Sequence, residues 1–338
     1  MIEQSPFPIV NKRSIQFRER AFQVGNVTGV NAYRIHRASL KQRLIEGGYR
    51  IHETPHFLYC RLAELSRQPE MQGKPVMQEI LVHWFAPEVI DSDLGHFIME
   101  ELKPPGIVEN TRAYGDIFGA IVGSLFPHDN QCAWHLYAAN TLQRYHQRLD
   151  DHISSPRDDH PGEVFAALYH RVCQLCTGTS LLDAGCSSGF LPLIAAERVP
   201  QLTHVLGIDI YDAPFATARA MAGERHLPHV RFQQVDLLAE SAASLPPFDT
   251  VTALHVLEHF TEADMYRVLS TLLKLTSRRL ILAVPYESGQ PEPAYGHLQL
   301  FTREKLEAVG RWCIEQWNGG MRSYENCAGG LLWVDRNA

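Results

Sequence analysis

The sequence predicts an α/β protein with a doubly wound, mostly parallel sheet in its C-terminal half and a mixed α/β region before it. Beyond residue 163, five short apolar runs alternate with helical patterns, which is typical of parallel strands joined by helices. The segment at 150–163 is polar, carries two prolines and lacks apolar periodicity, as in a linker or exposed loop. We therefore expect an N-terminal region at 1–150, a linker at 151–163 and a second domain at 164–338.

The first 150 residues are expected to contain both helices and strands. Asn31 is in position to cap a helix that ends at Gly47–Gly48. The run VMQEILVHWFA (76–86) is apolar and suits a strand, whereas residues 113–126 and 133–149 have helical patterns. No motif in this region indicates a chemistry, so we expect it to bind a substrate, to form a lid or to mediate oligomerisation.

The second half is expected to form seven strands. Two runs in the tail, WCIEQWNGG (312–320) and AGGLLWVDR (328–336), would form a hairpin that adds an antiparallel strand at one edge. Helices are expected at 190–199, 214–225 and 262–275. The five runs that would form the parallel strands are SLLDAGC (180–186), HVLGIDI (204–210), VRFQQVD (230–236), FDTVTALHV (248–256) and RRLILAVP (278–285).

Composition argues against several classes of protein. The chain has 45% hydrophobic and 20% charged residues, as an ordinary globular protein does, and no run of eighteen apolar residues that would cross a membrane. The N-terminus lacks a basic stretch followed by an apolar one, so no secretory signal is predicted and the cytoplasm is the expected compartment. The seven cysteines are scattered and odd in number, which does not suggest a disulfide framework.

Charge is unevenly spread along the chain. Residues 1–50 hold nine Lys or Arg and three Glu, a balance of +6; the whole chain carries −7, so the residues after 50 carry −13. A basic arm can contact a phosphate or another acidic partner, or it can be a solvated helix face. The basic residues are not interleaved with aromatic ones as on a nucleic-acid surface, which favours the solvated face.

A glycine turn follows the first expected strand of the second half. In LLDAGCSSGFLPL, Gly185 and Gly189 let the backbone approach a ligand, and N–H groups at the start of the next helix suit an anionic group. The spacing is G-x-x-x-G rather than G-x-G-x-x-G, which argues against NAD. Asp209 is placed to accept hydrogen bonds from ribose hydroxyls, and Asp236 from an adenine amino group. Together with Asp183, three acids close three successive strands, which indicates a nucleoside cofactor.

With these residues, the segment from about 165 to 336 resembles the class I S-adenosylmethionine-dependent methyltransferases. Their first motif, D/E-x-G-x-G-x-G, is matched by Asp183, Gly185 and Gly189, with Ser187 in place of the middle glycine. The resemblance implies a Rossmann-like methyltransferase sheet of seven strands and S-adenosylmethionine as the cofactor. It implies cofactor contacts from Asp183, Gly185, Cys186, Ser187 and Gly189 at the methionine end, from Asp209 at the ribose, from Asp236 and Leu237 at the adenine, and from Ile210 and His255.

The stretch HVLEH (255–259) fits H-x-x-E-H, one of the zinc-peptidase patterns. In those peptidases the pattern lies on a helix, so that both histidines share one face. Here it begins at the end of an expected strand, and the peptidase interpretation is therefore not favoured. Ubiquinone-pathway O-methyltransferases and small-RNA 2′-O-methyltransferases resemble this chain more closely, because they carry E-x-x-E-H here and a later histidine before an aromatic-Thr/Ser pair.

By that resemblance, His255, Glu258, His259 and His297 would bind a divalent cation that orients an acceptor hydroxyl. His255 replaces the first glutamate of the pattern, and a histidine-rich ligand set favours a transition metal over magnesium. Two alternatives stay open. His259, His297 and Glu258 would act as a base or orient the acceptor without a metal, or these residues would be structural.

The loop after the fifth parallel strand, YESGQPEPAYGH (286–297), carries Tyr286, Glu287 and Tyr295. Its position suits an acceptor-binding wall or a lid, and a solvated connection is the alternative. "CQLC" (173–176) stands alone on an expected helix without a second cysteine pair nearby, so zinc or redox chemistry is not favoured there.

The function that these features favour is O-methylation of a small metabolite by a cytoplasmic enzyme. No membrane partner is expected, and a homodimer stays open. An RNA methyltransferase would be favoured only if the basic arm lay beside the cofactor cleft. A non-catalytic module that keeps the nucleoside pocket is the alternative from another class, because the three acids alone do not distinguish a binding protein from an enzyme.

Overall fold

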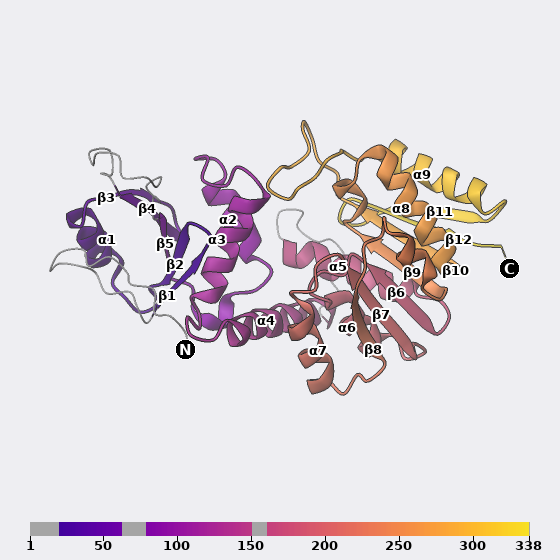
Figure 1. The fold of residues 1–338 in the computed structure, drawn as a ribbon, viewed down its shortest axis with the longest axis horizontal. Helices are drawn as coiled ribbons and strands as arrows, with labels where there is room; N and C mark the ends of the chain where they lie inside the picture. Colours follow the sequence, from indigo (N-terminus) through magenta and orange to yellow (C-terminus); the bar gives the residue numbers. More distant parts are fainter. Residues whose placement is uncertain (1–19, 63–78, 151–160, 338) are drawn as a thin grey trace. The chain divides into compact units, whose positions relative to one another are not determined.

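The computed structural model describes residues 20–62, 79–150 and 161–337 (Figure 1). Contacts divide the chain into two compact units. The N-terminal unit takes residues up to Ile90 with Phe97–Val108 and Arg112–Leu136; the C-terminal unit takes Asp91–His96, Glu109–Thr111 and Tyr137–Ala338. Residues 137–150, which the sequence assigned to the first region, thus group with the second unit. Of the predicted linker, residues 161–163 open a helix and 151–160 lie outside the described residues.

The N-terminal unit is built on a five-stranded mixed sheet. Its strands are β1 (Ala21–Val24), β2 (Val27–Asn31), β3 (Tyr49–Glu53), β4 (Phe57–Leu62) and β5 (Glu79–His83). They lie in the order β1-β2-β5-β4-β3, with β2 and β5 parallel and the other pairs antiparallel. Helix α1 (Arg37–Glu46) buries Leu40 and Leu44 against this sheet. Between β5 and α3 (Thr111–Gly123) lie a 3₁₀ turn (Pro87–Val89) and α2 (Leu94–Leu102).

The predicted cap of the first helix is wrong. Asn31 is the last residue of β2, where it pairs with His83 of β5, and its side-chain oxygen accepts a hydrogen bond from the Tyr33 N–H. The helix begins five residues later, with His36 as its N-cap. A short polar side chain can close a turn after a strand as readily as it caps a helix. The predicted stop at Gly47–Gly48 is confirmed.

The C-terminal unit contains the predicted seven-stranded sheet. Its strands are β6 (Ser180–Ala184), β7 (His204–Asp209), β8 (Val230–Gln234), β9 (Phe248–Leu254), β10 (Thr276–Val284), β11 (Met321–Asn326) and β12 (Gly330–Asp335). The order is β11-β12-β10-β9-β6-β7-β8, and neighbouring strands are parallel except where β12 pairs with β10 and β11. The predicted α/β, mostly parallel fold is confirmed.

Helices cover both faces of this sheet (Figure 1). On one face, α8 (Glu262–Leu275) and α9 (Arg303–Gln316) bury Leu269 and Val309 in one core cluster with Val251 of β9. On the other, α6 (Phe190–Arg198) packs on β6, β7 and β8, and α7 (Phe215–Glu224) packs on β8. The longer helices α4 (Asn130–Asp150) and α5 (Pro161–Leu175) precede β6. Within the described residues, no helix is both long and apolar enough to span a membrane.

The predicted tail hairpin needs correction. Residues 312–316 are the end of α9, and the strand that follows begins only at Met321. Leu306, Val309 and Cys313 are buried at three- and four-residue spacing, which is the period of a helix. The edge strand is β11, while the antiparallel strand, β12, lies one place inside the edge.

Candidate active site

The candidate site lies where the parallel strands of the C-terminal sheet end. Strands β6, β7, β8, β9 and β10 run in the same direction, so the segments that follow them meet at one edge of the sheet. Crevices at this edge are where open α/β sheets bind ligands. The residues that the sequence proposed for cofactor binding lie in these strands or in the turns that follow them, whereas His297 and Tyr295 lie further along the loop beyond β10.

The turn after β6 requires its glycines. Gly185 and Gly189 have φ angles of 75° and 76°, in the left-handed region. A Cβ on Gly185 would lie 2.4 Å from Val256, and one on Gly189 would lie 2.5 Å from the ring of Phe232. Ser187, which stands where the resemblance has a glycine, also adopts a positive φ of 47°. The substitution therefore keeps the shape of the turn at a cost of roughly 1 kcal/mol of backbone strain.

Asp209 holds this turn in place. Its carboxylate accepts hydrogen bonds from the Ser187 N–H at 2.8 Å and from the Tyr211 N–H at 3.0 Å. A carboxylate has about four lone-pair positions, so two remain for ribose hydroxyls. The neighbouring side chains of Ile210 and Tyr211 are 51% and 72% exposed. Exposed apolar side chains beside a polar anchor suit the flat face of a base.

Asp183 is buried at the end of β6. The Thr252 hydroxyl donates to its carboxyl group at 2.6 Å. Burial raises the pKa of Asp183 to about 7, opposed by the Thr252 hydrogen bond and reinforced by the nearby Asp209. A buried carboxyl in this state is stabilised by a cationic ligand, which would favour its charged form.

The remaining cofactor candidates differ in exposure. Asp236 is exposed two residues after β8, and its carboxylate accepts from the Leu238 N–H at 2.8 Å. Leu237 is buried. Cys186 is buried inside the glycine turn, and burial raises the pKa of its thiol, so it stays protonated and unreactive.

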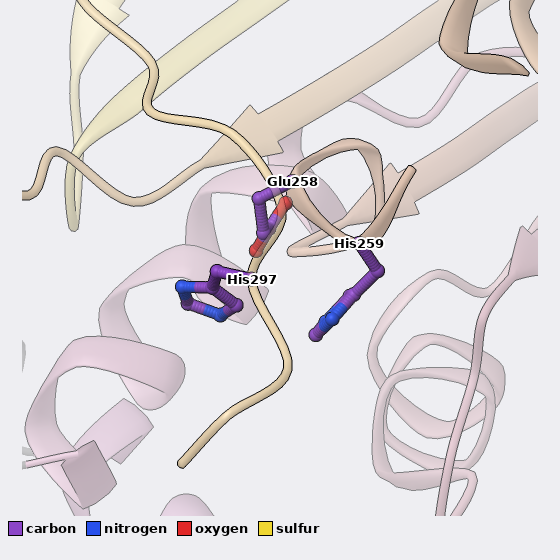
Figure 2. Close-up of side chains that lie close together, drawn as sticks. All are labelled: Glu258, His259 and His297. Atoms are coloured by element: carbon purple, nitrogen blue, oxygen red, sulfur yellow. The ribbon is translucent and has the colours of Figure 1, made fainter. Parts of the chain in front are cut away.

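Three side chains with metal-binding chemistry come together beside these residues. Glu258 and His259 lie in the 3₁₀ turn Leu257–His259 after β9, and His297 lies in the loop after β10. One ligand atom of each lies within 4.8 Å of the others, and the three side chains point toward one another (Figure 2). The pattern H-x-x-E-H thus spans a strand end and a 3₁₀ turn rather than a peptidase-type helix.

Glu258 is the most unusual member of the group. It is 1% exposed, and neither carboxyl oxygen has a hydrogen-bond partner on another described residue. Burial, together with the charge of Glu287, raises the pKa of Glu258 to about 8. A buried carboxyl without a partner is costly, and a bound cation or a polar ligand would remove that cost.

Both histidines of the group are held through Nδ1. The Nδ1 of His259 lies 3.3 Å from the carbonyl oxygen of Gly296, and the Nδ1 of His297 lies 2.8 Å from the Glu287 carboxylate. A carbonyl and a carboxylate only accept, so in the neutral form of each imidazole Nδ1 carries the proton and Nε2 keeps its lone pair. From the sequence, the loop that carries Glu287 could be an acceptor-binding wall, a lid or a solvated connection, and nothing in it indicated the contact with His297, ten residues away.

His255 lies outside the group of three. Its backbone has a φ of 54°, and its ring packs 5.1 Å from that of Phe165. Its Nδ1 is 3.7 Å from Glu258. Burial, with the charges of His297 and His259, lowers the pKa of His255 to about 4, so the imidazole is neutral at physiological pH.

Comparison with known proteins identifies this half of the chain. Residues 181–278 match a family model described as a methyltransferase domain. Together with the fold and the three acids at its strand ends, this match identifies a class I S-adenosylmethionine-dependent methyltransferase domain in the C-terminal half, as the resemblance predicted.

Two similar relatives are ubiquinone biosynthesis O-methyltransferases. The protein from Stutzerimonas stutzeri (strain A1501) is 36% identical over 98 residues, and that from Acinetobacter baumannii (strain AYE) is 30% identical over 98 residues. Each match covers 29% of this chain and 40% of the relative. This chain therefore spans about two fifths of the length of the curated relatives it matches. Among solved structures, that of the small RNA methyltransferase HEN1 has a TM-score of 0.46 and 17% identity over 53% of this chain and 26% of that one.

The residues at the strand ends fit S-adenosylmethionine. The buried Asp183 suits the cationic methionine end, the two free lone-pair positions of Asp209 suit the ribose, and the exposed Ile210 suits the adenine. The nucleic-acid and homodimer alternatives gain no support from the residues that the structure describes.

Proposed function

We propose that this protein methylates a hydroxyl group of a small metabolite, with S-adenosylmethionine as the methyl donor. The observation that carries the proposal is Glu258, a buried carboxyl without a hydrogen-bond partner among the described residues, beside the imidazoles of His259 and His297. The group lies at the same sheet edge as the cofactor acids. A hydroxyl has to lose its proton when it is methylated, and a base or cation beside the acceptor serves that step.

The chain's own residues bind and orient the two reactants. Asp183 would pair with the amino group at the methionine end, Asp209 would accept from the ribose, and Asp236 with Leu237 would hold the adenine. S-adenosylmethionine, when bound, supplies an electrophilic methyl group on sulfur. Methyl transfer then depends mainly on holding nucleophile, methyl and sulfur in line, which proximity and orientation can accelerate strongly.

In the first version of this proposal, which the buried carboxyl of Glu258 supports, the three side chains hold a divalent cation. Glu258, His259 and His297 would be its ligands. His255, the fourth residue of the predicted set, lies outside this group, with its Nδ1 3.7 Å from the Glu258 carboxyl. Two imidazole nitrogens and one carboxylate are typical ligands of zinc, iron and related transition metals. Such an ion, when bound, supplies positive charge that lowers the pKa of a nearby hydroxyl.

In the second version, a histidine takes the proton without a metal. His259 supports it: burial lowers the pKa of this histidine, although its hydrogen bond to Gly296 opposes the shift. The imidazole is therefore neutral near pH 7, with Nε2 free to accept a proton.

The role of the N-terminal unit is part of the proposal. The cofactor residues and the group of three all lie in the C-terminal unit. We propose that residues 1–150 serve acceptor binding, as a lid or specificity element, with the methyltransferase domain at 164–338.

The test is methyl transfer from labelled S-adenosylmethionine, first to a small-metabolite extract and separately to RNA, followed by isolation of the labelled product. We expect label in a small molecule, on oxygen. Label in RNA, or on nitrogen or carbon alone, would contradict the proposed acceptor. His259→Ala and Glu258→Gln should each lower the rate on that acceptor by at least about 100-fold. His204→Ala, at the opposite edge of the sheet, is the matched control and should leave the rate unchanged.

Methyl-transfer activity in the presence of a metal chelator distinguishes the two versions. If the group holds a cation, activity should vanish in chelator and return with a divalent transition metal. If His259 acts as a base, chelator should have no effect, and the rate should rise with pH through a pKa below the usual value of about 6.5 for histidine.

A further inference from the structure

We infer that Glu287 is a positioning residue, which holds the imidazole of His297 in the tautomer that leaves Nε2 with its lone pair. The inference rests on the proposed function, because it says what fixes one of the three side chains of that site. Glu287 lies three residues after β10, ten residues before the histidine that it contacts. It is not a member of the group of three.

The contact has the geometry of a specific hydrogen bond. The Glu287 carboxylate lies 2.8 Å from the His297 Nδ1, and the two side chains are 20% and 8% exposed. The His297 ring is flanked by the ring of Tyr295 at 5.7 Å and that of His259 at 5.0 Å. A partly buried ring between two others has little freedom to find another acceptor, so the proton position depends on Glu287.

The rest of the loop is fixed independently of Glu287. The Leu298 N–H donates to the Glu258 carbonyl oxygen at 2.8 Å, and the Thr111 hydroxyl donates to the Pro293 carbonyl oxygen at 2.9 Å. The Gly296 carbonyl accepts from His259. Removing the Glu287 side chain should therefore leave the loop in place and change mainly the state of the His297 ring. A free imidazole prefers its proton on Nε2, where it would block ligand binding.

Glu287 also adds negative charge to the group. Its carboxylate lies close enough to Glu258 to help raise the pKa of that residue. Two carboxyl groups beside two imidazoles are a ligand set that suits a divalent cation. Carboxylates that orient metal-binding histidines typically contribute about 10–100-fold to metal affinity.

The first test is the tautomer of His297 in full-length, metal-free protein labelled with ¹⁵N-histidine. The His297 signals are assigned by their loss in His297→Gln. We expect the Nδ1–H form in the unaltered protein and in Glu287→Gln, whose amide oxygen still accepts, and a shift to the Nε2–H form in Glu287→Ala. Glu292→Gln, an acidic residue of the same loop, is the matched control and should leave the tautomer unchanged. The Nε2–H form in the unaltered protein, or the Nδ1–H form in Glu287→Ala, would overturn the inference.

The second test is calorimetric titration of the same proteins with Zn²⁺ and Mn²⁺. We expect Glu287→Ala to weaken binding by about 10–100-fold and Glu287→Gln by less, because only the charge is lost. Equal affinity in Glu287→Ala and the unaltered protein would contradict the inference. An unaltered protein that binds neither ion contradicts instead the metal version of the proposed function, while the tautomer still decides the role of Glu287.

Discussion

Asp183 and Asp249 are two aspartates in one sheet with opposite surroundings. Asp183 is buried at the carboxyl end of β6, with a pKa raised to about 7 by burial. Asp249 lies near the start of β9, at the opposite edge. Burial there is outweighed by hydrogen bonds from the Thr179 N–H and from Ser277, and by the charge of Arg278, which together lower its pKa. The sheet thus carries a stabilising carboxylate at the amino ends of its parallel strands and a destabilising carboxyl at their carboxyl ends, where we propose that the cofactor binds.

Replacing Asp183 by Asn should change the pH dependence of stability. An acid with a raised folded-state pKa stabilises the fold fully below its unfolded pKa of about 3.9 and loses that contribution as pH rises to about 7. The loss is at most roughly 4 kcal/mol, at about 1.4 kcal/mol for each pKa unit. Without ligand, Asp183→Asn should therefore be more stable than the unaltered protein at pH 8. This gain in stability should be smaller at pH 5. Urea unfolding of both proteins at the two pH values measures the difference.

Asp249→Asn is the matched contrast. Because its folded-state pKa is lowered, Asp249 contributes stability above its unfolded pKa and loses it as pH falls through the folded one. The variant should be less stable than the unaltered protein at pH 7, and the difference should vanish in acid. The same slope with pH for both variants would contradict this account of the two edges.

At the scale of elements, the turn between β6 and α6 depends on glycine. Gly185→Ala should destabilise the protein by about 1–3 kcal/mol, because the new methyl meets Val256 and the residue must keep a positive φ. Gly223→Ala, in α7, is the control: a Cβ there has no neighbour within 4 Å. It should be neutral or stabilise by up to about 1 kcal/mol. Thermal unfolding measures the change in stability of both variants. Equal changes in Gly185→Ala and Gly223→Ala would show that the turn tolerates a side chain.

The elements that could be predicted from sequence are those whose pattern is local. The runs that form β6, β7 and β9 are each short, apolar and bounded by turn residues, and their alternation with helices predicted a parallel sheet. The run 312–320 resembles a strand because Trp312, Cys313 and Ile314 form a short apolar run that is followed by polar and turn residues. The helical period becomes visible only when Leu306 and Val309, upstream of that run, are included.

The site was predicted in part for the same reason. Glu258 and His259 follow β9, and His297 lies in the loop after the neighbouring parallel strand β10, so the topology alone predicts that they lie at the same end of the sheet. The bond between Glu287 and His297 depends on how the intervening loop folds, and no sequence period reports it. The position of the His255 side chain depends on the positive φ of His255, and the sequence does not indicate a positive φ at a residue other than glycine.

At the scale of the whole molecule, ion pairs and a hydrogen bond within the C-terminal unit join residues 91–93 to α4 and to the start of α5. Arg144 of α4 contacts the carboxylates of Asp91 and Asp93, which are 8% and 7% exposed in their side chains. Asp93 also accepts from the Gly162 N–H at 3.1 Å, at the start of α5. These contacts explain why Asp91–His96 group with the C-terminal unit although most of the surrounding sequence does not.

Arg144→Ala should therefore be costly. It leaves two nearly buried carboxylates without their cation, and a loss of about 1–3 kcal/mol is expected, since the arginine is itself 37% exposed. Arg267→Ala is the control, because Arg267 is 63% exposed and pairs with Asp264 on one helix face. It should change stability by less than about 0.5 kcal/mol. Urea unfolding measures the loss of stability in each variant. Equal losses in Arg144→Ala and Arg267→Ala would contradict this account.

The central claim is that the strand ends of the C-terminal sheet bind S-adenosylmethionine, and its most direct test is calorimetric titration of the full-length protein with S-adenosylhomocysteine. We expect a site in the micromolar range, about −8 kcal/mol. Asp209→Ala should weaken it by about 1–3 kcal/mol, because the ribose hydroxyls lose a charged acceptor, whereas Asp212→Ala, three residues further along, should not. Absence of binding, equal competition by NADH, or an unchanged affinity in Asp209→Ala would contradict the claim.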